Sequence, residues 1–353
     1  MPPPPACVTP NVVLAPHTTM GLGGPARWYA RCTNIDELRG SLTYAQLSGL
    51  PVQVFSGGSN IIFADEGFDG LVVNVALRGY RAEETGEDAL LTVAAGEPWD
   101  SVVVRAVDRG WVGIECLSGI PGSTGGTPVQ NVGAYGQDVG ETLTSVRAID
   151  RRTLTERTFS RQECGFGYRE SRFKGSDADR FVITEVQFRL KKETQPEIRY
   201  GELAREIEAE RPGGSAERLT SGDVRRAVLA LRRRKSMVTD AADENSRSVG
   251  SFFTNPVVPE SFLAEKLKGL PVPTFPATGG IKLSAAWLVE HAGFPKGFRR
   301  EGAGISENHA LAIVNRGGTT AHVLALAAEI EREVERKFGI RLTREPVIVR
   351  YRP

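Results

Sequence analysis

The chain of 353 residues has a formal net charge of +1, with 40% hydrophobic and 25% charged residues, which is ordinary for a globular protein. This charge balance provides no general attraction to nucleic acid or to an anionic membrane. No uninterrupted run of about 18 apolar residues occurs, so we expect no membrane-spanning helix. The length predicts two domains, or one large and one small domain.

The first residues, MPPPPACVTP, lack both a basic stretch and an apolar stretch. We therefore expect residues 1–15 to be a disordered tail, not a signal peptide, and the protein to be cytoplasmic. The following GLGGPA (21–26) fits the dinucleotide fingerprint G-x-G-x-x-A. No strand pattern precedes it and no helix pattern follows Pro25, so we exclude a Rossmann domain. A P-loop is excluded because GxxxxGK[ST] does not occur.

Between about 20 and 190, short β-type runs alternate with glycine-rich turns. One helix is predicted over 98–108, ending at Gly110. The region is a β-rich α+β arrangement without regular βαβ units. The predicted strands cover 51–55, 70–75, 89–96, 145–150 and 181–190.

The second half begins with a polar stretch at 194–210 and a basic helix over 221–236. Ser221 is its expected N-cap, and Val224, Val228 and Leu231 share one face. A polar linker at 239–248 leads to a second α+β region. Its predicted elements are a helix at 284–293, a strand at 309–315, a helix at 320–338 stopped by Gly339, and a last strand at 345–351.

The four cysteines are widely separated, with no C-x-x-C pair, and the four histidines show no H-E-x-x-H spacing. We therefore expect reduced, buried thiols and neither a metal site nor a disulfide framework.

Two glycine-rich loops follow strand-like runs: SGGSNIIF (56–63) and LSGIPGSTGGTPVQNVGAYGQDVG (117–140). Backbone N–H groups in such loops can converge on an anion, and glycine lets the backbone approach closely. A tight turn is the alternative for either loop alone. Two loops of this kind, both rich in Ser, Thr and Asn, indicate a dinucleotide or pyrophosphate cofactor.

Taken together, several segments resemble the UDP-N-acetylenolpyruvoylglucosamine reductase family. They run in family order from about residue 16 to 347, and GIPG–QNVGAYG and GSFF-x-NP are the most specific. RYGEL indicates the subclass with a tyrosine-bearing loop over the substrate. The matching segments are TTMGLGGPA, GGSN, GIPGSTGGTPVQNVGAYG, CGFGYRES, RYGEL, GSFFTNP, KLSAAWLVEHAG and LTREP.

The resemblance implies an α+β fold: a two-lobed FAD-binding fold of the vanillyl-alcohol-oxidase type, then a smaller α+β substrate-binding domain. The implied domains are an FAD-binding domain at 16–195 that splits near 77, a linker with the tyrosine loop and basic helix at 196–247, and a substrate-binding domain at 248–353. The last strand is expected to return to the active site.

The implied enzyme is a flavin-dependent NADPH oxidoreductase of peptidoglycan precursor synthesis. It reduces, through FAD, the enolpyruvyl group of UDP-N-acetylglucosamine enolpyruvate to the lactyl ether of UDP-N-acetylmuramate. Its partners are the UDP-sugar and NADPH, without nucleic acid or membrane insertion, and we expect a monomer. Residues 56–60 offer no histidine or cysteine, so we expect non-covalent FAD. The implied cofactor residues are Gly57, Gly58, Ser59, Asn60, Gly119, Gly122, Ser123, Gly125, Gly126, Gln130, Asn131, Gly133 and Ala134.

Three residues match catalytic positions of the family. Ser251 matches the proton donor; a serine is a weak acid, but the enolate formed in the reaction is a strong base, so the hydroxyl needs only positioning and exclusion of water. Arg169 matches the arginine at the substrate carboxylate, which a guanidinium can grip while staying charged. Glu345 matches a carboxylate near the substrate, although its REP context departs from the commoner leucine-x-proline-glutamate pattern. Phe252 and Phe253 are expected to pack in the core.

The resemblance also assigns substrate residues: Tyr168, Tyr200, Lys235, Asn255 and Glu290. Lys235 and Asn255 match contacts to the UDP-sugar diphosphate, and Tyr200 matches the mobile-loop tyrosine. Glu290 matches a segment at the uridine end. The neighbouring arginines at 232–234 are expected to lie mostly on the surface.

Two alternatives remain open from the sequence. An FAD oxidase of the same fold should carry an attachment histidine and lack the set Ser251, Arg169 and Glu345. A UDP-sugar binding module without catalysis would keep Lys235 and Asn255 but would not need Ser251. The intact set favours the reductase.

Overall fold

The computed structural model describes residues 2–192, 194–211 and 218–351. Its contacts divide the chain into two compact units. Unit 1 comprises residues 1–12, 26–57 and 69–234, and unit 2 comprises residues 13–25, 58–68 and 235–353. Residues 58–68, which include most of the first glycine loop, are thus grouped with the C-terminal third of the chain. The domain boundaries inferred from the sequence do not coincide with these units and stay a prediction.

One sheet of unit 1 has the strand order β1-β2-β5-β3, and β3 runs parallel to β5. Its strands are β1 (Val8–Val13), β2 (Pro25–Cys32), β3 (Val52–Phe55) and β5 (Phe68–Val75). The strand β1 contradicts the disordered tail expected over 1–15, because pairing with β2 orders a segment whose local composition predicts disorder. Helix α1 (Ile35–Leu47), which the sequence reading missed, begins where the Asn34 side chain accepts the Glu37 N–H at 2.9 Å.

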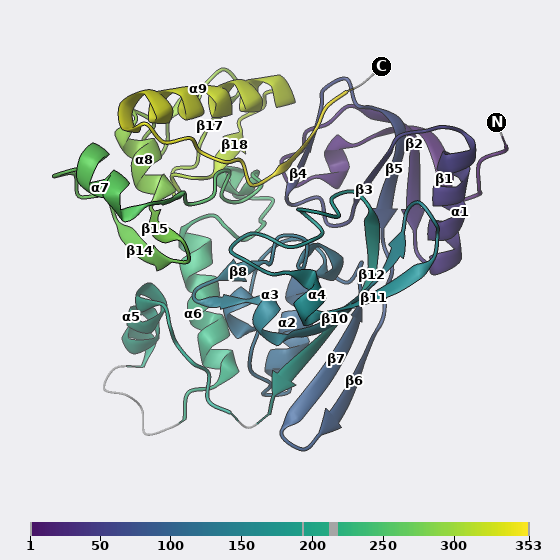
Figure 1. The fold of residues 1–353 in the computed structure, drawn as a ribbon, viewed down its shortest axis with the longest axis horizontal. Helices are drawn as coiled ribbons and strands as arrows, with labels where there is room; N and C mark the ends of the chain where they lie inside the picture. The colour runs from purple at the N-terminus through teal and green to yellow at the C-terminus, as the bar shows by residue number, and fades with distance from the viewer. Residues whose placement is uncertain (1, 193, 212–217, 352–353) are drawn as a thin grey trace. The chain divides into compact units, whose positions relative to one another are not determined.

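The second sheet of unit 1 is antiparallel, in the order β11-β10-β12-β7-β6 (Figure 1). Helix α2 (Trp99–Asp108) buries Trp99, Val102, Val103 and Ala106, the spacing of one helical face, and contributes to the same core. Gly110 follows with a φ of +69°, as expected for the residue that ends this helix. The strands are β6 (Tyr80–Thr85), β7 (Asp88–Ala94), β10 (Leu143–Asp150), β11 (Glu156–Ser160) and β12 (Phe181–Lys191).

The rest of unit 1 consists of short elements and two packed helices, α5 (Gly201–Glu210) and α6 (Ser221–Arg234), which lie side by side in Figure 1. Helix α6 confirms the predicted basic helix, but its cap is Thr220 and not Ser221: the Thr220 hydroxyl and the Asp223 backbone and carboxylate form a capping box. The short elements are η2 (Glu115–Leu117), η3 (Thr124–Gly126), β8 (Gly133–Ala134), β9 (Gln137–Asp138), α3 (Val139–Thr142) and α4 (Arg161–Cys164).

Unit 2 has its own core, in which α9 (Thr320–Phe338) packs over β17 (Ala303–Ile305) and β18 (Ile313–Asn315), and α8 (Ala285–His291) packs against α9. The last strand, β19 (Val347–Val349), runs parallel to β4 (Ile61–Phe63). The remaining elements are η1 (Ala15–His17), η4 (Glu244–Ser246), β13 (Val257–Val258), α7 (Glu260–Lys266), β14 (Thr274–Ala277), β15 (Gly280–Leu283) and β16 (Arg299–Arg300).

Helix α9 follows the predicted limits closely. Thr319 and His322 form a capping box at its start, and Gly339 ends it with a φ of +69°. Its buried positions, including Val323, Ile330 and Val334, recur at helical spacing. The exclusion of a Rossmann fingerprint is also confirmed, because a strand, β2, begins at Pro25 where the fingerprint requires a helix.

Candidate functional site

The first residues of one glycine-rich loop meet the second glycine-rich loop within unit 1. Gly57 follows β3, and a Cβ atom placed on it would lie 2.5 Å from the Cα of Gly122. Only glycine permits this contact, because real Cβ atoms do not approach backbone so closely. Gly126 differs from both, since a Cβ on it would meet nothing within 4 Å. The backbones at Gly57 and Gly122 are therefore in direct contact, and Gly126 faces open space.

The second loop is held by the segment that enters α2. The Gly125 N–H donates to the Ala95 carbonyl oxygen at 2.8 Å, and the Trp99 N–H donates to the Gly122 carbonyl oxygen at 3.0 Å. A Cβ on Gly125 would lie 2.6 Å from the Cβ of Ala95. The loop is thus shaped by close packing against Ala95, which leaves glycine as the residue that fits.

Asp100, in the first turn of α2, anchors the start of the same loop. Its carboxylate accepts the Gly119 N–H at 2.6 Å and two hydrogen bonds from Arg225, at 2.6 and 2.8 Å. Burial raises the pKa of Asp100, but the bonds from Arg225 and Gly119 outweigh it, so that the pKa lies below its ordinary value. The Gly119 amide is therefore engaged within the protein, and Arg225 is a positioning residue that sequence reasoning missed.

Asn131 ties the later part of the loop to the turn that carries Arg169. Its Nδ2 donates to the Gly167 carbonyl oxygen at 3.0 Å, and its Oδ1 accepts the Gly140 N–H at 2.9 Å. A Cβ on Gly140 would lie 2.9 Å from this Oδ1. The side chain of Asn131 thus holds the loop in shape.

Arg169 lies against the predicted cofactor loop. Its Nη2 donates to the Gly133 carbonyl oxygen at 2.8 Å. Gly167 and Glu170 exchange backbone hydrogen bonds on either side of the turn, and Arg169 has a φ of +57°, a conformation that costs free energy for a side chain of this size. The exposed Tyr168 ring lies 5.5 Å from its guanidinium carbon.

Tyr200 also belongs to unit 1, as the residue immediately before α5. Its ring meets the edge of Tyr135 with 5.5 Å between centroids, and 40% of the residue is exposed. Burial of the rest raises the pKa of its hydroxyl. Tyr200 therefore has one packed face and one face open to solvent.

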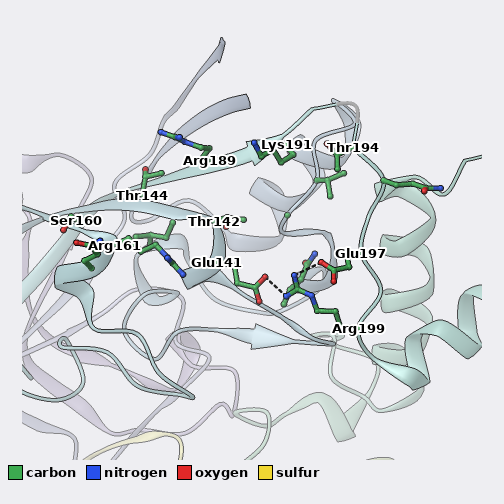
Figure 2. A pocket seen from close by; sticks show the side chains of 16 residues that line it. Glu141, Thr142, Thr144, Ser160, Arg161, Arg189, Lys191, Thr194, Glu197 and Arg199 are labelled. Carbon is green, nitrogen blue, oxygen red and sulfur yellow. Dashed lines mark hydrogen bonds and ion pairs between the residues drawn. The ribbon is translucent and has the colours of Figure 1, made fainter. Parts of the chain in front are cut away.

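A cavity of about 700 Å³ in unit 1 is lined in part by Arg199, the residue before Tyr200 (Figure 2). Polar and charged side chains dominate its wall, among them Thr144, Arg161, Lys191 and Glu141. None of the predicted site residues is among those that line it in the described part of the chain.

Ser251 and Glu345 lie on adjoining segments of unit 2. The Glu345 N–H donates to the Phe252 carbonyl oxygen at 2.9 Å, and Thr254 N–H donates to the Thr343 carbonyl oxygen at 3.0 Å. Phe252 and Phe253 are fully buried, which confirms the expected core packing. The chain immediately after Ser251 is therefore fixed by two backbone hydrogen bonds to the segment that carries Glu345.

Asn60 joins this group. Its Nδ2 donates to the backbone oxygen of Glu345 at 3.3 Å, and its own backbone oxygen accepts the Val347 N–H at 3.0 Å. Arg344, the unusual residue before Glu345, is held elsewhere: its guanidinium forms two hydrogen bonds to Glu331 of α9, at 2.6 and 2.8 Å. Arg344, which departs from the leucine-x-proline-glutamate pattern of the family, thus connects this segment to α9.

Two predicted substrate residues belong to the α8 region of unit 2. Asn255 accepts the Ala285 N–H at 2.9 Å through its Oδ1, at the start of α8, and its Nδ2 carries two further donors. Glu290 is half-buried in the last turn of the same helix. Lys235 is half-buried and follows Arg234, the last residue of α6.

The arginines at 232–234 were expected to lie mostly on the surface. Arg232 contradicts this expectation, because only 7% of its surface is exposed. Burial lowers the pKa of its guanidinium, and the nearby Tyr135 and Asp100 partly offset that effect. The signal was present in the sequence: Arg232 follows Val224 and Val228 at eight and four residues, which places it on the apolar stripe. Arg233 is exposed, and Arg234 pairs with Glu206 at the surface.

Across residues 2–192, 194–211 and 218–351, no cluster of three or more His, Cys, Asp or Glu has the arrangement of a metal site. The four cysteines are free, and burial raises the pKa of Cys32 and Cys164 to about 12. Among the described helices, none combines the length and the apolar character that crossing a bilayer requires.

Comparisons with known proteins decide the family. The UDP-N-acetylenolpyruvoylglucosamine reductase of Thermobifida fusca (strain YX) is 47% identical over 352 residues, covering 96% of this chain and 97% of that protein. The chain belongs to the UDP-N-acetylenolpyruvoylglucosamine reductase family. The reductase of the same name from Saccharopolyspora erythraea is 46% identical, covering 98% of this chain and 96% of that protein.

Family models and a solved structure agree. The FAD binding domain model matches residues 26–157, and the model of the UDP-N-acetylenolpyruvoylglucosamine reductase C-terminal domain matches residues 242–349. The crystal structure of the Thermus caldophilus reductase is similar in fold, with a TM-score of 0.64 at 23% identity over 97% of this chain and 98% of that chain. The α+β FAD-binding fold is confirmed.

Family membership also confirms the class of reaction. The chain is a flavin-dependent oxidoreductase that uses FAD, with NADPH as co-substrate, for a reduction in peptidoglycan precursor synthesis. The tyrosine-loop subclass and the roles of individual residues stay predictions.

Proposed function

We propose that this chain reduces the enolpyruvyl double bond of UDP-N-acetylglucosamine enolpyruvate, with Ser251 as proton donor and Arg169 and Glu345 as catalytic partners. The observation that carries this proposal is the hydrogen bond from the Glu345 N–H to the Phe252 carbonyl oxygen, which brings the glutamate next to the serine segment. The relatives named above, similar over nearly the whole chain, support the substrate.

The residues fit FAD. When bound, FAD takes a hydride from NADPH and supplies it to the β carbon of the enolpyruvyl group. The apposed backbones at Gly57 and Gly122, with Gly126 facing open space, suit a pyrophosphate that must approach main-chain N–H groups. We assign non-covalent attachment, because residues 56–60 contain neither histidine nor cysteine. The residues proposed to hold FAD are Gly57, Gly58, Ser59, Asn60, Gly119, Gly122, Ser123, Gly125, Gly126, Gln130, Asn131, Gly133 and Ala134.

Ser251 then completes the reduction. Hydride addition at the β carbon leaves an electron pair delocalised from the α carbon into the substrate carboxylate. The Ser251 hydroxyl transfers its proton to the α carbon, so that a C–H bond forms as the O–H bond breaks. The two buried phenylalanines after Ser251 fix its backbone and keep the segment dry, which suits a weak acid that acts only when a strong base appears.

Arg169 and Glu345 act on charge. The guanidinium of Arg169 pairs with the substrate carboxylate, where the negative charge develops, and its strained backbone is the kind of feature that clusters at active sites. The half-buried carboxyl of Glu345 orients the Ser251 hydroxyl.

The UDP-sugar is held by other side chains. Lys235 and the Nδ2 of Asn255 bind the diphosphate, since an ammonium and an amide are both suited to phosphate oxygens. Tyr200 and Tyr168, both partly exposed, contribute hydroxyl groups and ring faces. Glu290 binds the uridine end.

The decisive experiment measures two half-reactions separately in the Ser251→Ala variant: reduction of the flavin by NADPH, and reoxidation of the flavin by the enolpyruvyl substrate. Anaerobic bleaching of the bound flavin by NADPH should keep its wild-type rate, while reoxidation by the enolpyruvyl substrate should slow by about 100-fold to 10,000-fold, the range for a lost general acid. Thr254→Ala, three residues along the same segment, is the matched control and should leave both rates unchanged. Normal reoxidation by Ser251→Ala would remove the proton-donor role.

The same experiment, with a parallel run in which dioxygen is admitted to the reduced protein, tests the alternatives. A flavin oxidase would be reoxidised by dioxygen in preference to the enolpyruvyl substrate. A binding module would give a protein that holds the UDP-sugar without reoxidation in either the wild type or the variant.

A further inference from the structure

Arg199, the residue before Tyr200, joins the start of α5 to a different part of unit 1. Its Nη1 donates to Glu141 of α3 at 2.9 Å, and its Nη2 donates to Glu197 at 2.7 Å. Figure 2 shows the guanidinium between the two carboxylates. Both acids raise the pKa of Arg199, so that it stays charged. Glu141 is the more enclosed partner, with 36% of its side chain exposed against 70% for Glu197.

Apart from Glu197, the partners described for Arg199 and Tyr200 come from one short segment, 133–142. Its β8–β9 hairpin closes through Tyr135 and Gly136, both with positive φ (50° and 87°), as in a type I′ turn. The Tyr135 ring meets Tyr200, and a Cβ on Gly136 would lie 2.9 Å from the Cβ of Arg199. Together with the Glu141 ion pair, these contacts join the two segments at three points.

The hairpin itself is held firmly. The Gln137 side chain accepts the Cys116 N–H at 2.9 Å and donates to Glu115 at 2.8 Å. Glu115 is fully buried and accepts the Gly113 N–H at 2.6 Å. The hairpin is therefore a fixed support, to which the segment before α5 attaches.

The chain before Tyr200 presents its side chains in alternation. Ile198 packs onto the cluster that contains Leu203 of α5 and Val224 and Val228 of α6. Arg199, the next residue, instead forms its ion pair with Glu141. Successive side chains of an extended segment point to opposite sides, so the ion pair and the apolar contact fix the segment from two directions.

We propose that Arg199 is a positioning residue: its ion pair with Glu141 holds Tyr200 against Tyr135 and so couples the UDP-sugar contact to the flavin loop. The coupling follows from the hairpin, because Gly133 belongs to the proposed FAD loop and its carbonyl oxygen also accepts Arg169. The inference rests on the substrate role proposed for Tyr200. A partly exposed ion pair is weak, so that it can open and re-form during turnover.

Kinetics of Arg199→Gln and Glu141→Gln test the proposal. Each should raise the KM for the enolpyruvyl substrate by roughly two- to fivefold, the range for a partly exposed ion pair, without changing the rate of flavin bleaching by NADPH. The double variant should raise KM no further than either single variant. The exchanged pair, Arg199→Glu with Glu141→Arg, should recover part of the loss.

The matched control is Arg39→Gln, which removes a comparably exposed surface pair with Glu156 and should leave KM unchanged. Additive effects of Arg199→Gln and Glu141→Gln, or unchanged KM in both, would overturn the proposal.

Amide hydrogen exchange tests, without any measurement of activity, whether the ion pair holds the segment, and the KM of Tyr200→Ala tests whether Tyr200 contacts the substrate. In the substrate-free holoenzyme, Arg199→Gln and Glu141→Gln should both speed amide exchange over 199–205, whereas Arg39→Gln should not. Unchanged exchange would show that the ion pair does not hold the segment. If exchange rises but Tyr200→Ala leaves KM unchanged, the substrate role of Tyr200 fails and the structural part of the inference stands alone.

Discussion

The guanidinium of Arg169 donates a hydrogen bond to the backbone oxygen of Gly133 at 2.8 Å, so that a proposed catalytic cation lies against the proposed flavin loop. Arg169 has a positive φ, and the turn that carries it is fastened to the same loop through Asn131. An arginine can serve two groups at once because its planar fork has five N–H donors. One nitrogen of Arg169 thus hydrogen-bonds the loop, and this bond sets the orientation of the remaining N–H donors of the guanidinium.

Arg169→Lys tests this arrangement. Lysine keeps the charge but loses the fork, so we expect the reoxidation of the reduced flavin by the enolpyruvyl substrate to slow by roughly 10- to 100-fold, the value of a hydrogen bond to a charged group. Stopped-flow absorbance measures it. Arg157→Lys, in an exposed pair with Glu163, is the control and should change nothing. Equal rates in both variants would count against a role for the fork.

The two glycine loops allow a paired test of cofactor binding. Gly57→Ala should disrupt the loops, because the new Cβ would lie 2.5 Å from Gly122, and we expect a loss of about 1–3 kcal/mol in the free energy of unfolding together with weak FAD binding. Gly126→Ala meets nothing in the protein, so it should unfold like the wild type yet bind FAD more weakly. Flavin titration and urea unfolding of the apoprotein measure the two effects. Wild-type FAD affinity in Gly126→Ala would show that Gly126 does not face the cofactor.

The Asp100–Arg225 pair predicts a pH dependence of stability. The folded-state pKa of Asp100 is lowered, so its contribution is present above the unfolded pKa of about 4 and is lost as the pH falls through the folded value. Because 40% of the carboxylate side chain is exposed, we expect about 1 kcal/mol or less. The difference in unfolding free energy between wild type and Asp100→Asn should therefore shrink from pH 6 toward pH 3. A difference that grows on acidification would contradict the assignment.

Arg344→Met tests whether the unusual residue before Glu345 serves structure alone. The variant loses two hydrogen bonds to Glu331, and we expect the unfolding free energy to fall by about 1 kcal/mol with both half-reactions unchanged. Glu331→Gln should give a similar loss. Slower reoxidation in Arg344→Met but not in Glu331→Gln would instead connect Arg344 to the chemistry.

Much of the fold and of the candidate site was predictable. The strands at 52–55, 68–75 and 181–191 and the helix Thr320–Phe338 have local signals: alternation, helical spacing and caps that a short window contains. Motifs such as GSFFTNP are likewise local, and they indicated the family before any contact was known. The sequence by itself thus determined the family, the candidate residues and the type of those elements that carry such local signals.

Only the tertiary structure decided which of these residues meet. Gly57 touches Gly122 across 65 positions, residues 8–13 become a strand by pairing with β2, and Arg232 is buried with Tyr135 and Asp100 nearby. Glu141 and Arg199, 58 residues apart, form their ion pair only when α3 and the segment before α5 come together. Such contacts depend on chain topology, and no local window carries that information.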